Sequence, residues 1–356
     1  MIKTSSKVRL IVRLVVFLFL FSLLFSTVSA GIPLSASETS SYKEMRLYPG
    51  GMPFGIKFLT AGVVVVGFHR LSDGSENPAL QAGLRPADVL LSANGQPLNS
   101  AEELNTLVEQ STGKPLSVRY SRDGAEHTAT VRPRYSKEEG RYTVGLSVKD
   151  SGAGIGTVTF IDPKTNAFAG LGHGICDTDT GELIPMQRGS VVGVTISGVV
   201  RGLPGSPGEV KGYFSTGKAG SLLGNSHCGV WGVFAKKPSG VTGEPMALCL
   251  RDQLKEGAAT ILCTVEGSTP TEYSIEISRI DRTCNGNKCF TVKVTDPKLL
   301  SKTGGIIQGM SGSPIIQNGR LVGAVTHVLI NDPTTGYGIF IENMLNAAQM
   351  PMAKAS

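Results

Sequence analysis

The chain has 356 residues, of which 40% are hydrophobic, 17% charged and 6% aromatic, with 45 glycines and 19 prolines. This composition excludes a disordered chain, because the apolar fraction is too high and the charge too low, and long heptad repeats are absent. The length predicts two domains, and the many glycines favour turn-rich β structure over a helical bundle.

The net charge of +6 belongs mostly to the N-terminus and argues against a nucleic-acid-binding protein. Residues 1–30 contain Lys3, Lys7, Arg9 and Arg13 and no acidic residue. The rest of the chain has 30 basic and 28 acidic residues and no block of Lys and Arg that could follow a phosphate backbone.

The basic N-terminal segment is typical of an export signal. An apolar run at 14–25 follows the cations, and small residues follow the run, as in a signal peptide. No charge lies between Arg13 and Glu38, so the same stretch is also long enough for a membrane anchor. Residues 1–30 are therefore predicted to be a cleaved signal or a retained anchor, and either one places the remaining chain outside the cytoplasm. The Ser-rich residues 31–47 are predicted to be an exposed tether.

Residues 48–133 form the first predicted folded unit. The expected elements are an apolar strand at 62–67, a short helix ending at Gly83, a strand at 89–93, a helix capped by Ser100 and a hairpin at 116–131. The run Ala-Gly-Leu-x-Pro-x-Asp-x-Leu-Leu-x-x-Asn-Gly within this unit resembles a PDZ domain of the bacterial protease type.

The PDZ resemblance implies a groove in which an extended peptide pairs with a strand edge and a turn of N–H groups holds its carboxylate. Phe54, Gly55 and Ile56 stand where that turn is expected. The alternative is that Gly55 only serves a tight turn and that the protein's own chain fills the groove.

Residues 141–348 form the second and larger predicted unit. Short apolar strands separated by glycine-containing turns predict an antiparallel sandwich or barrel. The expected strands lie at 156–161, 190–199, 229–235, 259–265, 291–294 and 321–328.

The motif Gly-Met-Ser-Gly-Ser-Pro, which begins at Gly309, is the strongest candidate for a catalytic site. A serine becomes a nucleophile when a base takes its proton and donors stabilise the oxyanion. The turn can present the Ser311 hydroxyl, and the N–H groups of Gly309 and Ser311 can form an oxyanion hole. A purely structural glycine turn is the alternative.

A base and an orienting acid are needed beside this serine. Among the histidines of the second unit, His173 is the candidate base because it lies in a turn of small residues after an apolar strand, whereas His227 and His327 are the alternatives. His173 precedes Ser311 in a β-rich unit, and this order resembles that of chymotrypsin-like serine peptidases. Asp296 ends a predicted strand, as a buried orienting acid requires. The other candidates are Asp177, Asp179, Asp252 and Asp281.

The six cysteines allow two cross-strand disulfides, but buried free thiols are an equal alternative. The candidate pairs are Cys249 with Cys263 and Cys284 with Cys289. A zinc site built from His173, Cys176, His227 and Cys228 is disfavoured because no pair has the spacing of a zinc knuckle. We therefore predict neither a metal nor a cofactor.

The combination of a PDZ-like unit, Gly-His-Gly at 172–174 and the serine motif closely resembles the SpoIVB peptidase family of stage IV sporulation proteins. The resemblance covers residues 48–345 and implies a chymotrypsin-like double β-barrel with the triad His173, Asp296 and Ser311. Thr326 and His327 follow the serine hairpin, where the strand that lines the specificity pocket is expected in such folds, and His327 could pair with an acidic or amide substrate side chain.

The family resemblance also implies a biological role. Such proteins are exported into the space between the forespore and mother-cell membranes, cleave themselves near the N-terminus, and cleave a regulatory subunit of an intramembrane metalloprotease to activate a sigma factor. The alternatives are a non-catalytic PDZ scaffold or chaperone and a broad extracytoplasmic clean-up protease.

Overall fold

A computed structural model describes residues 42–71, 73–241 and 243–348 of the chain. The predicted signal or anchor at 1–30 and most of the predicted tether lie outside the described residues. Within them, no helix is long and apolar enough to cross a bilayer.

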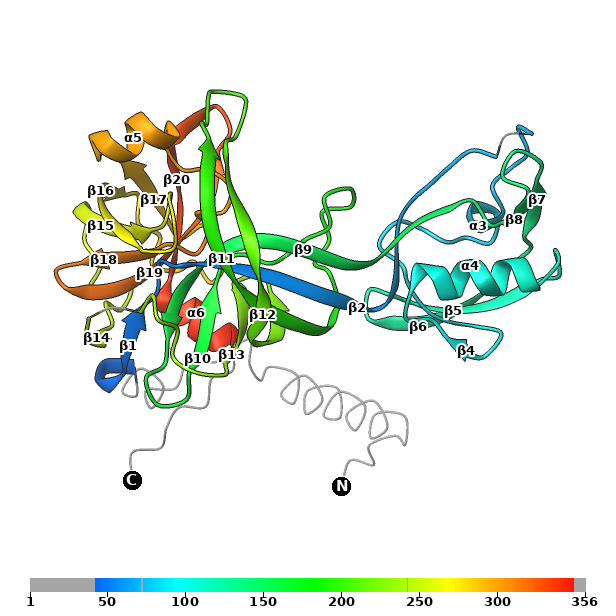
Figure 1. Cartoon of the computed structure of the whole chain (residues 1–356), viewed down its shortest axis with the longest axis horizontal. Coiled ribbons are helices and arrows are strands. Elements are labelled where there is room, and N and C mark those ends of the chain that lie inside the picture. The colour runs from blue at the N-terminus through cyan, green and yellow to red at the C-terminus, as the bar shows by residue number, and fades with distance from the viewer. Residues whose placement is uncertain (1–41, 72, 242, 349–356) are drawn as a thin grey trace, which may run out of the picture. The chain divides into compact units, whose positions relative to one another are not determined.

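The first barrel consists of six antiparallel strands (Figure 1). These strands are β2 (Pro53–Phe68), β9 (Leu146–Ile161), β10 (Ala167–Gly170), β11 (Met186–Val200), β12 (Glu209–Ser226) and β13 (Gly229–Phe234). They follow the order β9-β10-β13-β12-β11-β2, and pairing between β2 and β9 closes the ring. Apolar side chains that alternate along these strands form a core around Phe54, Phe168 and Phe234.

The second barrel is smaller and also closed, with the strand order β15-β16-β17-β20-β19-β18. Its strands are β15 (Gly257–Cys263), β16 (Thr271–Ser278), β17 (Phe290–Val294), β18 (Pro314–Gln317), β19 (Arg320–Leu329) and β20 (Asp332–Phe340). The turn at Asn318 and Gly319 has φ of 51° and 70°, as a type I′ hairpin between β18 and β19 requires. The predicted double β-barrel is therefore confirmed.

Four shorter elements complete the two barrels. They are β1 (Arg46–Pro49), β14 (Met246–Ala247), α5 (Pro297–Thr303) and α6 (Ile341–Ala347). The strand β1 pairs with both β9 and β14.

The PDZ unit is inserted between β2 and β9. It contains α3 (Pro78–Gln81), β3 (Val89–Ala93), β4 (Gln96–Pro97), α4 (Ala101–Gln110), β5 (Leu116–Arg122), β6 (Ala125–Val131), β7 (Arg134–Ser136) and β8 (Arg141–Thr143). The predicted cap is present, since the Ser100 hydroxyl accepts a hydrogen bond from the Glu103 N–H at 3.1 Å. A separate core around Leu90, Leu104 and Val118 stabilises the unit.

The long strand β2 belongs to the first barrel in its first half and to the PDZ unit in its second half. The segment 53–59 of β2 pairs with β11 and β9 in the first barrel, and the following residues, such as Val63 and Val64, pair with β3. An apolar strand pattern reports burial but does not identify the partner strand, so the sequence could not reveal this double role.

Candidate active site

Ser311 lies in the turn between α5 and β18, and two glycines shape this turn. Gly309 and Gly312 both have φ of +95°, in a region that residues with a side chain rarely adopt. A Cβ at Gly312 would lie 2.0 Å from the Thr157 carbonyl oxygen, and one at Gly309 would lie 2.2 Å from Val210. Both positions therefore require glycine, as the sequence motif indicates.

The backbone N–H groups of the turn divide into two sets. Within the described part of the chain, the N–H groups of Gly309 and Ser311 have no acceptor. By contrast, the N–H groups of Met310, Gly312 and Ser313 donate to carbonyl oxygens of the fold. The two unused donors are the pair expected to form the oxyanion hole.

His173 follows β10 in a tight turn that fixes its tautomer. Its Nδ1 lies 2.8 Å from the Gly174 carbonyl oxygen, which accepts only if Nδ1 carries the proton. Nε2 then remains free to accept a proton from a serine. Burial lowers the pKa of His173, and the Gly174 carbonyl partly opposes this shift. The imidazole is therefore neutral at pH 7, as a general base requires.

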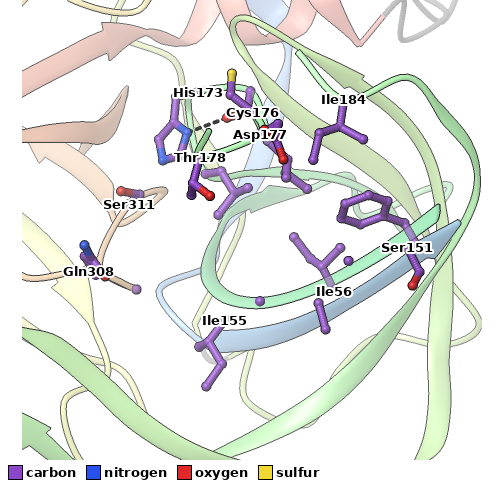
Figure 2. A pocket seen from close by; sticks show the side chains of 18 of the residues that line it. Ile56, Ser151, Ile155, His173, Cys176, Asp177, Thr178, Ile184, Gln308 and Ser311 are labelled. Carbon is purple, nitrogen blue, oxygen red and sulfur yellow. Dashed lines mark hydrogen bonds between the residues drawn. The ribbon is translucent and has the colours of Figure 1, made fainter. Parts of the chain in front are cut away.

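His173 and Ser311 line one cavity of about 520 Å³, and Figure 2 shows the serine hydroxyl beside the imidazole. The other lining side chains are mainly apolar and include Ile56, Phe58, Ile155, Leu171, Ile175 and Ile184. The Ser311 hydroxyl donates to the Thr326 carbonyl oxygen at 2.6 Å. Proton transfer to His173 thus requires rotation of this hydroxyl.

Thr326 and His327, the predicted specificity-pocket residues, do not line this cavity. The Thr326 hydroxyl donates to the carbonyl oxygens of Asn287 and Tyr337, and its side chain is buried. The ring centroids of His327 and His173 lie 4.9 Å apart. Burial, with smaller contributions from His173 and Lys288, lowers the pKa of His327 to about 4, so His327 packs as a neutral ring against the base.

Asp296, the predicted orienting acid, caps helix α5. One carboxylate oxygen accepts hydrogen bonds from the N–H groups of Lys298 and Leu299, and these bonds lower its pKa although burial opposes them. Among the described residues, no hydrogen bond or ion pair joins Asp296 to His173, whose Nδ1 lies against the Gly174 carbonyl oxygen. The role of Asp296 in a triad therefore stays a prediction.

Asp177 lies closer to the base and lines the same cavity as His173. Its carboxylate is 2.8 Å from Lys149 Nζ and also accepts the N–H groups of Asp179 and Thr180. These bonds overcome burial and lower the pKa of Asp177. Asp177 therefore shapes the loop after His173, while the imidazole itself contacts Gly174 and His327.

The predicted PDZ carboxylate turn at Phe54, Gly55 and Ile56 lies elsewhere in the structure. These residues belong to the first barrel, where Phe54 and Ile56 are buried in its core. A Cβ at Gly55 would lie 2.4 Å from the Phe214 ring, so glycine is needed there for packing. The assignment of these residues to a PDZ groove is corrected, because their strand is paired on both edges.

The sequence interpretation missed a different strand edge in the PDZ unit. Residues 146–149 of β9 follow Gly145, which has φ of +74°, and among the described strands they pair only with β2, along one edge. Helix α4 lies beside them, since the Ala101 N–H donates to the Asp150 carboxylate at 2.9 Å. The Val-Gly-Leu sequence at 144–146 is the signal that could have indicated this edge.

All six cysteines are free, and Cys249, Cys263 and Cys289 are buried. Of the two alternatives, free thiols and cross-strand disulfides, the structure contains the free thiols. In residues 42–348, apart from the two positions not described, no cluster of His, Cys, Asp and Glu could hold a metal ion.

Comparison with known proteins agrees with this geometry. The family model of the SpoIVB peptidase S55 matches residues 140–345, and a PDZ domain model matches residues 52–132. The chain belongs to the SpoIVB peptidase S55 family. It is therefore a serine peptidase with a PDZ domain.

Curated relatives share only part of their length with this chain. A protein named as a zinc metalloprotease from Neisseria meningitidis serogroup A is 38% identical over 105 residues, which are 30% of this chain and 20% of the relative. The protease eep of Enterococcus faecalis is 35% identical over 89 residues, covering 25% of this chain and 21% of the relative. The chain thus spans about a fifth of these two proteins.

Two solved structures are also similar. The Rv3671c protease of M. tuberculosis in its active form covers 57% of this chain and 75% of its own, with 15% identity and a TM-score of 0.30. The PDZ domain of an SdrC-like protein from Listeria monocytogenes covers 25% of this chain and 87% of its own, with 18% identity and a TM-score of 0.21.

Proposed function

We propose that this peptidase acts outside the cytoplasm, cleaves its own N-terminal tether, and cleaves a membrane-associated regulatory protein during spore formation. The observation that carries the catalytic part is the shared cleft of His173 and Ser311, with two unused N–H donors at the serine. The uncharged N-terminal stretch supports export, and the family resemblance supports the choice of substrate.

The proposed chemistry begins when Ser311 turns from the Thr326 carbonyl toward Nε2 of His173. The imidazole takes the hydroxyl proton as the serine attacks the substrate carbonyl carbon. The N–H groups of Gly309 and Ser311 then stabilise the oxyanion, and protonated His173 returns the proton to the leaving amine. Water hydrolyses the resulting ester by the same steps in reverse order.

We further propose that the PDZ unit binds a chain end or an extended segment along residues 146–149 of β9, beside α4. This edge has unpaired N–H and C=O groups in the described structure, as strand addition requires. Leu146 and Val148 are half-buried and pack on the PDZ core. Substrate recruitment would then depend on an edge remote in sequence from Phe54.

The test is incubation of the full chain alone, with N-terminal sequencing of any fragments. We expect the wild type to react with a fluorophosphonate at Ser311 and to be cut between Ala30 and Tyr48, and Ser311→Ala to remain intact. Labelling without self-cleavage would contradict the proposed processing while leaving the peptidase chemistry in place. Degradation of unrelated unfolded proteins at comparable rates would favour the clean-up protease instead.

A further inference from the structure

A second cavity, of about 790 Å³, adjoins the catalytic cleft. The two cavities share Phe58 and residues 151–153 of β9 as lining. Residues 151, 153 and 154 are exposed, and on the edge of β9 away from β2 no described strand pairs with residues 150–156. An extended polypeptide that leaves Ser311 across this edge therefore reaches the second cavity directly.

Strand register places four of the lining residues on one face of the first barrel. Lys57 lies opposite both Ala153 of β9 and Ser190 of β11, and Ser190 lies opposite Ser221 of β12. Directly paired residues share a face of a sheet. Because Ala153, Ser190 and Ser221 have short side chains, this row forms the floor of a groove.

Two further cations line the same cavity. Arg188 lies two residues from Ser190 along β11. Residues two apart on a strand point the same way, so Arg188 lies on the face of Ser190. Lys218 pairs with Val192 beside an irregularity in the strand register and lines the same cavity. Lys57, Arg188 and Lys218 define what we name the basic groove.

The charges of the basic groove are uncompensated. No acidic residue lines it, and within the described residues none of its three cations forms an ion pair. Lys57 instead lies 5.5 Å from the centroid of the Phe214 ring. By contrast, Lys211 on the same strand as Lys218 has Glu209 at 3.7 Å. A concave surface with one sign of charge attracts ligands of the opposite sign.

We propose that the basic groove is a substrate subsite that selects polypeptides with acidic residues next to the segment held in the catalytic cleft. The proposal rests on the peptidase activity at Ser311 and adds the substrate class. An acidic segment gains charge pairing with Lys57, Arg188 and Lys218, while a basic segment is repelled. Leu223, which is 62% exposed at the rim, offers an apolar contact for a residue between the acids.

The binding experiment uses the full chain with Ser311→Ala and a fluorescein-labelled random copolymer of Glu and Tyr, followed by anisotropy at 0.15 M salt. The groove variant combines Lys57→Gln, Arg188→Gln and Lys218→Gln. The matched control combines Lys164→Gln, Lys211→Gln and Lys236→Gln, three exposed lysines outside both cavities. We expect Kd to rise about 10-fold in the groove variant and less than about twofold in the control. Equal losses in both variants would overturn the proposal.

A second measurement connects the groove to the cleft. In the chain with Ser311 intact, the Glu–Tyr copolymer should slow fluorophosphonate labelling, and a Lys–Tyr copolymer should not. Binding without any slowing would overturn the subsite assignment, because the ligand would then not cross the cleft. If Ser311 is not labelled at all, the peptidase chemistry fails, and the anisotropy difference still tests the groove separately. Unchanged thermal unfolding of the variants establishes that the loss is local.

Discussion

The loops that carry Ser311 and His173 are stabilised in different ways. The serine loop belongs to the second barrel but is fixed by β9 of the first. The Thr157 hydroxyl donates to the Gly309 carbonyl oxygen and the Thr159 hydroxyl to that of Gly312, both at 2.8 Å. Both threonines are buried, so these neutral hydrogen bonds form away from water.

The histidine loop depends partly on charge at the surface. The Asn225 side chain bonds both the N–H and the C=O of Ile175 within the first barrel. Asp177 is then paired with Lys149, whose side chain is 40% exposed. Water and salt weaken such a pair. The comparison teaches that the nucleophile is positioned rigidly, whereas the base is positioned by contacts that depend on solution conditions.

The largest expected effect comes from removing the two groups that these loops present. Ser311→Ala and His173→Ala should each lower kcat by roughly 10⁴-fold or more, because nucleophile and base act as a unit. Peptide hydrolysis measures the loss, and fluorophosphonate labelling should disappear in the serine variant. If His173→Ala retained kcat within tenfold, another residue would have to be the base.

Thr157→Val tests the loop that carries Ser311. The change keeps the shape of the side chain but leaves the Gly309 carbonyl without its donor, which should cost about 1–2 kcal/mol of folding stability. We expect kcat to fall roughly tenfold because the N–H of Gly309 belongs to the oxyanion hole. Thr159→Val is the matched control, with a similar loss of stability and a smaller loss of kcat.

Lys149→Met tests the loop that follows His173, which depends partly on charge at the surface. The variant loses the pairs with Asp177 and Asp179, so we expect kcat to fall about threefold. Wild-type activity should also decline with added salt, while the variant should respond less. Arg119→Met, which breaks an exposed pair with Glu126 in the PDZ unit, is the control and should change neither property.

The pH dependence should separate the two histidines. Since the pKa of His173 lies below its ordinary value near 6.5, activity should persist below pH 6.5 before the base is protonated. His327 has a pKa of about 4 in the folded chain and near 6.5 when unfolded. The unfolded chain therefore binds more protons in this window, and stability should fall from pH 6.5 toward 4. Urea unfolding should show this slope flattened in His327→Leu; an unchanged slope would contradict the burial of His327.

The smallest effect is expected for Asp296→Asn. Asparagine caps helices about as well as aspartate, so Tm should change little. The contacts of the carboxylate with α5 and Ser274 predict that kcat stays within about threefold, whereas the triad prediction gives the opposite result. A fall of 10²–10⁴-fold with unchanged Tm would instead establish Asp296 as the orienting acid.

Local sequence determined much of this protein. Alternating apolar residues and glycine turns predict the strands, and the chemistry of the Ser311 turn requires its glycines. The capped helix at Ser100 and the hairpin at Asn318 also follow from residues within a few positions of each other. Such features depend on short-range hydrogen bonds and on backbone preferences, and both can be predicted from neighbouring residues in the sequence.

Tertiary structure alone decided which distant strands meet. The sequence suggests a PDZ turn at Phe54, yet β2 pairs on both edges within the first barrel. Strand pairing depends on long-range register, and an apolar strand looks the same whichever neighbour it has. The basic groove is a further case, because Lys57, Arg188 and Lys218 line one cavity only once three strands are aligned.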